Sequence, residues 1–172
     1  ANVVCMSVSE FYTDTLSWYI NVAHYKVSHT CISNYMVSML TSSIESLNEN
    51  YDAKILSLSS MKSMVLAGER VNPITIDAFI KVAKTYGFDD KALNISYGLT
   101  ESASTFTHTD ADKILNRINT LDAGEVFSVG KIFSGYKMII IDENEDIIND
   151  ELMLGEFCIN GPSIINHYCN VD

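Results

Sequence analysis

The apolar positions in the first part of the chain alternate between a helical and an extended period. Three segments repeat apolar residues every three or four positions, as amphipathic helices do: 8–26, 34–47 and 73–86. Pro73 suits the first turn of the third helix, and Gly87 suits the position just after its end. Short apolar runs typical of strands occupy 1–4, 61–67 and 92–97. This order predicts a layered α/β sheet over residues 1–104.

The pattern changes after about residue 105. Residues 108–123 are polar and indicate a helix or a loop. From Val126 onward strands and turns alternate, and the strand-like segments are 137–141, 147–148 and 156–160. The acidic run 142–146 is interpreted as the turn between the first two of these. We therefore expect an α/β subdomain over 1–124 and an antiparallel, β-rich subdomain over 125–172.

Composition and charge narrow the possible functions. The chain has 11 Lys and Arg against 22 Asp and Glu, a formal net charge of −11, which disfavours binding to nucleic acid or to an anionic membrane. No apolar run is long enough to cross a bilayer, and residues 1–7 lack the basic start of a signal peptide. The four cysteines form no CxxC pair and are sparse, which favours a reduced, cytoplasmic setting over a zinc ribbon or a disulfide scaffold. The abrupt termini suggest a piece of a longer polypeptide.

The segment SYGLTES, residues 96–102, combines residue types that a nucleotide and metal site needs. Gly98 permits a sharp turn or a close approach of a ligand to the backbone. The Thr100 hydroxyl can contact a phosphate, and the Glu101 carboxylate can bind a hard cation such as Mg²⁺. On these residues alone, a plain strand-to-loop turn with a solvated glutamate is the commoner explanation.

A second strand also ends in a glycine, within LAGERV at 66–71. A helix joins the two strands, so they form a βαβ unit whose carboxyl ends lie side by side. Ligands bind at this edge in open α/β sheets. The alternative is that Glu69 and Arg70 are an ordinary surface ion pair.

Three blocks in this order resemble motifs of the adenylate-forming enzymes, which include acyl-CoA synthetases, peptide-synthetase adenylation domains and luciferases. SYGLTES resembles their YGxTE motif, and LAGERV resembles the segment that lines their adenine pocket. GEFCINGPSIINHY at 155–168, preceded by a VGK segment, resembles GELxVxGxxVxxGY, except that His167 replaces the usual glycine. Within the superfamily, the segments 17–26 and 86–93 look most similar to fatty-acyl-AMP ligases.

The resemblance implies roles for individual residues around the nucleotide. Tyr97 would stack near the adenine, and Gly68 and Glu69 would border it. Thr100 and Glu101 would be the catalytic residues, Thr100 by contacting the α-phosphate and Glu101 by binding Mg²⁺. The remaining roles concern the acyl group: Gly98 would let the backbone pass close to the acyl-adenylate, and Asn34 and Met36 would line the acyl pocket.

By the same resemblance, the chain is a central part of an AMP-binding domain. Its parent would use ATP and Mg²⁺ to convert a fatty acid to fatty-acyl-AMP, then pass the acyl group to the thiol of an acyl carrier protein or of coenzyme A. The superfamily's phosphate loop, ribose-binding aspartate and catalytic lysine have no counterpart in these residues. We therefore expect the 172 residues alone to be inactive without the remaining parts of the same protein.

Two alternatives remain open on the sequence. One is a sibling enzyme, either an acyl-CoA synthetase or an amino-acid adenylation domain. The amino-acid option needs a carboxylate for the substrate ammonium, and no Asp lies between Lys26 and Asp52. The other alternative is a non-catalytic, adenylation-like binding module. The Thr100–Glu101 pair argues against such decay, whereas His167 argues for it.

Overall fold

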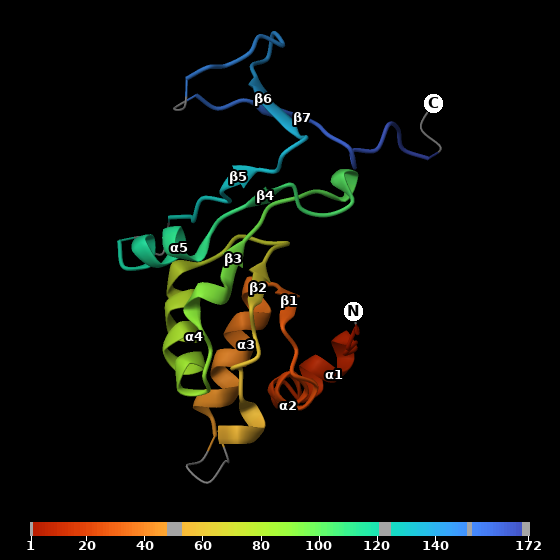
Figure 1. Cartoon of the computed structure of the whole chain (residues 1–172). Coiled ribbons are helices and arrows are strands. Elements are labelled where there is room, and N and C mark those ends of the chain that lie inside the picture. The colour runs from red at the N-terminus through yellow and green to blue at the C-terminus, as the bar shows by residue number, and fades with distance from the viewer. Residues whose placement is uncertain (1, 48–52, 121–124, 151–152, 170–172) are drawn as a thin grey trace.

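The computed structural model describes residues 2–47, 53–120, 125–150 and 153–169. Its central element is a parallel sheet in the order β1-β2-β3 (Figure 1). The strands are β1 (His29–Ile32), β2 (Ser63–Leu66) and β3 (Leu93–Ile95). Their last residues align, because Ile32 is opposite Leu66 and Leu66 is opposite Ile95. The carboxyl ends of all three strands therefore meet at one edge of the sheet.

Two helices connect these strands. α3 (Asn34–Glu45) joins β1 to β2, and α4 (Pro73–Thr85) joins β2 to β3; the two helices pack against each other. The first turn of each helix is capped by a side chain, because Ser33 accepts from the Met36 amide and Asn72 accepts from the Ile74 amide. The prediction of helices at 34–47 and from Pro73 is thereby confirmed, as is a parallel β2-α4-β3 unit.

The first helical segment is divided. α1 (Val8–Thr13) ends at Asp14, whose backbone is not helical (φ −142°, ψ 85°), and α2 (Leu16–Tyr25) follows. Both helices bury apolar residues in the same core as the sheet and α3 and α4. The largest fully buried side chains of the core include Tyr19, Phe11, Phe79, Leu40, Met64 and Leu66. A single core therefore supports the edge where the three strands end.

The later strands lie beyond that edge (Figure 1). Short 3-10 turns are η1 (Ala53–Leu56), η2 (Asp90–Ala92) and η3 (Thr100–Ser102). β4 (Thr107–His108) pairs antiparallel with β5 (Lys131–Ile132), and α5 (Ala111–Ile118) lies between them in sequence. β6 (Lys137–Ile141) pairs antiparallel with β7 (Glu156–Asn160). The mixed α/β architecture followed by antiparallel strands agrees with the expected fold class.

Several local predictions are wrong. Residues 2–7 form no strand, because nothing in the described chain pairs with them, and the apolar side chain of Val3 is exposed. β1 carries no apolar alternation and was not predicted; its pairing with β2 makes it a strand. The chain does turn at 142–146 and return beside β6 as predicted, since Ile147 bridges Ile141 and the Ile148 amide donates to the Ile140 carbonyl, but the strand that pairs along all of β6 is β7. The predicted break at 48–50 lies outside the described residues. Among the described residues, no helix is long and apolar enough to span a membrane.

Candidate functional site

The two glycine-containing strand ends lie next to each other, as the βαβ arrangement requires. The Ser96 amide donates to the Leu66 carbonyl at 3.0 Å, which continues the pairing of β2 and β3 by one residue. Gly68 and Gly98 then border the same cavity of about 420 Å³. Gly68 has φ +85°, a conformation that glycine adopts without strain. Val126, Phe127 and Val129, in the segment before β5, also line it.

Tyr97 forms a side of this cavity and is held in place by its neighbours. Its ring lies edge-on to Phe106, with centroids 5.6 Å apart and planes at 84°, and it contacts Phe157 at 6.0 Å. Its backbone amide donates to the Thr107 hydroxyl at 3.0 Å. Tyr97 as a whole is 37% exposed, so the residue is not sealed inside the core.

A second cavity of about 410 Å³ shares Gly68 and Gly98 with the first. Its other wall is the loop that contains Thr100 and the segment 103–105. Among the described residues that line it, none carries a carboxylate, an ammonium or a guanidinium group. An uncharged group would therefore meet no unpaired charge from these side chains.

Gly98 is needed because the chain folds back closely upon it. A Cβ at this position would lie 2.0 Å from the Ser104 carbonyl oxygen. The loop is closed by the buried Ser102 hydroxyl, which accepts from the Leu99 amide at 3.0 Å and is 2.6 Å from the Ser104 carbonyl oxygen. The close approach at Gly98 thus shapes the loop whose Thr100 lines the second cavity.

Glu101 lies at the surface, and its carboxylate has one side-chain partner. The Tyr168 hydroxyl donates to Oε1 of Glu101. This hydrogen bond, with a second from the backbone, keeps the pKa of the Glu101 carboxyl below its usual value. The same contact raises the pKa of the Tyr168 hydroxyl. A carboxylate that stays ionised is a suitable oxygen ligand for Mg²⁺, although no cluster of three metal-ligating side chains occurs among the described residues.

Glu69 and Asn34 support the N-terminus of α3 and the neighbouring loop. Oε1 of Glu69 accepts from the Tyr35 amide at 2.6 Å, so its charge lies at the positive end of α3. Oδ1 of Asn34 accepts from the Asn72 amide at 2.9 Å. In this structure both side chains bind backbone groups, and Glu69 also borders the cavity of Tyr97.

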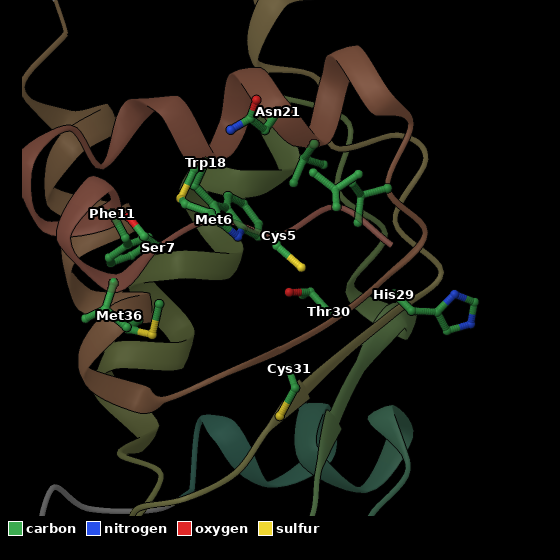
Figure 2. Close-up of a pocket in the computed structure, with 14 residues that line it drawn as sticks. Cys5, Met6, Ser7, Phe11, Trp18, Asn21, His29, Thr30, Cys31 and Met36 are labelled. Atoms are coloured by element: carbon green, nitrogen blue, oxygen red, sulfur yellow. The ribbon is translucent and has the colours of Figure 1, made fainter. Parts of the chain in front are cut away.

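Met36 lies in a different place from the other predicted site residues. Figure 2 shows it with Phe11 and Trp18 around a cavity of about 340 Å³, between the N-terminal segment, α2 and β1. Neither cavity that contains Gly98 includes Met36 or Asn34. The structure thus gathers Gly68, Glu69, Tyr97, Gly98 and Thr100, and leaves the two predicted acyl-pocket residues outside this group.

Sequence reasoning missed two contributions to the site. Phe127 and its neighbours follow a polar segment, and nothing local indicates that they return to the end of β3. Tyr168 belongs to the motif at 155–168, but the motif alone does not show that its hydroxyl donates to Glu101, 67 positions earlier.

Comparisons with known proteins identify the family and the fold. The model of the AMP-binding enzyme family matches residues 1–169. The chain is 25% identical over 165 residues to microperfuranone synthase of Emericella nidulans, which covers 95% of this chain and 17% of that protein. The chain therefore spans about a sixth of the length of this curated relative.

Solved structures with the same fold include adenylation domains and acyl ligases. The McyG A-PCP structure complexed with phenylalanyl-adenylate superposes with a TM-score of 0.81 and 24% identity, over 96% of this chain and 25% of that one. An adenylation domain of a keto acid-selecting module, bound to keto acyl adenylate, has a TM-score of 0.75 and 18% identity. The match covers 93% of this chain and 33% of that one. A chain from a study of fatty acyl-adenylate ligases of E. coli and L. pneumophila superposes with a TM-score of 0.72 and 20% identity. The match covers 91% of this chain and 31% of that one.

Proposed function

Since this chain belongs to the AMP-binding enzyme family, we propose that it is the nucleotide-binding part of an ATP-dependent ligase that activates a carboxylic acid. The acid's carboxylate attacks the α-phosphorus of ATP, an acyl-adenylate forms, and pyrophosphate leaves. The observation that carries the proposal is the cavity shared by the ends of β2 and β3, with Tyr97 on one side and Gly68 on another. A planar base fits between a tyrosine ring and an exposed glycine backbone.

The neighbouring loop supplies the groups that the transferring phosphate needs. Thr100 lines the second cavity, which shares Gly98 with the first, and its hydroxyl hydrogen-bonds an α-phosphate oxygen in this proposal. Glu101 follows it and presents an ionised carboxylate at the surface. Mg²⁺ bound there supplies positive charge to the phosphates, which stabilises the charge that develops during phosphoryl transfer.

The acid is proposed to be one without an ammonium group next to its carboxylate, with a fatty acid as the first choice. The second cavity offers no carboxylate among its described lining residues. The acidic side chain that lines the first cavity, Glu69, already accepts from the Tyr35 amide. A protonated amine in this cavity would therefore lose its hydration without gaining a counter-ion.

The acceptor is proposed to be a carrier-protein thiol, with coenzyme A as the alternative. Support comes from the McyG structure, in which the adenylation domain is joined to a PCP. The acceptor thiol must be reduced to form a thioester, which favours a reducing compartment such as the cytoplasm. The four cysteines of this chain are also free thiols.

ATP–pyrophosphate exchange by the complete polypeptide that carries this chain tests the function. Dodecanoate, a 2-oxo acid and a mixture of amino acids are offered separately. Exchange with dodecanoate alone supports the proposal as stated. Exchange with amino acids alone keeps the ligase and overturns the acid class. A folded polypeptide that exchanges with none of them is better described as a non-catalytic binding module.

A further inference from the structure

We propose that Tyr168 is a positioning residue that holds the Glu101 carboxylate in place for its cation, and that the segment 161–168 carries it there. This inference rests on the proposed function, because it assigns a purpose to the orientation of Glu101. It concerns a residue 67 positions away in sequence, in the β-rich part of the chain.

The hydrogen bond leaves the carboxylate able to bind a cation. The Tyr168 hydroxyl donates to Oε1 only, whereas a carboxylate offers about four lone-pair sites on two oxygens. A glutamate at the surface otherwise samples many rotamers, and a cation must fix them at an entropic cost. The hydrogen bond from Tyr168 already favours one rotamer of Glu101, so less side-chain entropy is lost when the cation binds.

The segment that carries Tyr168 is attached to the backbone beside Glu101. The Ile165 amide donates to the Glu101 carbonyl at 2.9 Å. The Ser163 hydroxyl donates to the Ser102 carbonyl at 2.6 Å. Two consecutive carbonyls of the Thr100–Ser102 turn therefore bind the same short segment, so the placement of the Tyr168 side chain is not left to a single contact.

The start of this segment is fixed against Tyr136, the residue just before β6. The Tyr136 hydroxyl and the Ser163 hydroxyl are 2.5 Å apart. Gly161 packs so closely on the Tyr136 ring that a Cβ would lie 2.1 Å from Cδ1. Because 161–168 follows β7, which pairs with β6, the hairpin determines where the tyrosine is held.

The exposure of Tyr168 separates positioning from folding. Its side chain is 56% exposed and is not part of the buried core. Removing the hydroxyl alone, in Tyr168→Phe, leaves the ring and the backbone contacts of the segment unchanged. The fold is therefore expected to tolerate this variant. The orientation of the Glu101 side chain is expected to change, because it loses its hydrogen bond from Tyr168.

The test measures exchange by the complete polypeptide as a function of Mg²⁺ concentration. Tyr168→Phe is expected to raise the Mg²⁺ concentration for half-maximal exchange about 3- to 10-fold, with the rate restored by excess Mg²⁺. Tyr25→Phe is the matched control, because Tyr25 is also 56% exposed and its hydroxyl forms no hydrogen bond among the described residues. An equal loss of rate at every Mg²⁺ concentration indicates damage to the fold and overturns the proposal.

Direct binding of Mn²⁺, followed by electron paramagnetic resonance with a non-hydrolysable ATP analogue, gives a readout that does not need turnover. Glu101→Gln is expected to abolish the bound signal and Tyr168→Phe to weaken binding about 3- to 10-fold. Binding that depends on Glu101 but is unchanged in Tyr168→Phe overturns the positioning role. An absence of exchange with normal Mn²⁺ binding identifies failure of the proposed function instead.

Discussion

The side-chain oxygen of Asn34, the first residue of α3, accepts a hydrogen bond from the backbone amide of Asn72, 2.9 Å away, just before α4. Asn72 in turn caps α4 through the Ile74 amide. The starts of two helices that flank β2 are thus joined through one side chain. The resemblance to adenylate-forming enzymes assigned Asn34 to the acyl pocket, whereas this contact assigns it a structural role.

Replacement of Asn34 distinguishes these roles. Asn34→Ala is expected to lower the free energy of unfolding by about 1 kcal/mol, because the Asn72 amide loses its half-buried acceptor. The measurement is urea denaturation of the variant and of the unaltered chain. Ser42→Ala, at an exposed position of the same helix, is the control and should change stability by less than about 0.5 kcal/mol. Equal stability of Asn34→Ala with altered acid selectivity would favour the pocket role.

Gly98 and Gly68 should respond differently to alanine. Gly98→Ala is expected to lower the free energy of unfolding by more than about 2 kcal/mol, since its Cβ would lie 2.0 Å from the Ser104 carbonyl oxygen. The Cβ that Gly68→Ala adds would have no atom within 4 Å. Only the left-handed backbone conformation therefore disfavours alanine, and the free energy of unfolding should fall by about 1–2 kcal/mol. Denaturation of both variants checks the order. A Gly98 variant as stable as the Gly68 variant would contradict the close approach.

Alkaline pH should destabilise the chain through Tyr19. This side chain is fully buried and its hydroxyl donates to the Leu40 carbonyl at 3.2 Å, and burial raises the pKa of the hydroxyl well above its usual range. The unfolded state loses its proton near pH 10 while the folded state keeps it, so stability is full below that pH and falls as pH rises above it. Thermal unfolding between pH 8 and 11 should show this fall, and Tyr19→Phe should reduce its slope.

Acid should act on the hairpin through Asp142. Its carboxylate accepts from the Asn144 and Asp146 amides at 2.8 and 2.9 Å, and these bonds lower the pKa of the carboxyl. Since the folded pKa is below the unfolded one, the stabilisation is present above the unfolded pKa and is lost as pH falls through the folded value. NMR titration of the Asp142 carboxyl in the folded chain measures this pKa directly. A value at or above that of an unstructured peptide would refute the turn geometry.

Several features followed from the sequence because they depend on neighbouring residues. The helix from Pro73 was predicted from its apolar spacing, with Pro73 at its start and Gly87 after its end, and the structure confirms α4 there. The strand ends at Gly68 and Gly98 were predicted to adjoin, because parallel strands joined by a helix align their carboxyl ends. The family was recognised from three motifs, and its model matches residues 1–169.

Other features depended on contacts between distant segments, and only the tertiary structure decided them. β1 is a strand because β2 provides its hydrogen bonds, although its own residues do not alternate. The wall formed by Phe127 and the contact from Tyr168 to Glu101 join segments far apart in sequence. Asn34 turned toward the Asn72 amide, and Met36 toward a separate cavity, because packing of α3 selected those directions. Local pattern thus determined where the loop at Gly98 begins, and long-range packing determined which side chains surround it.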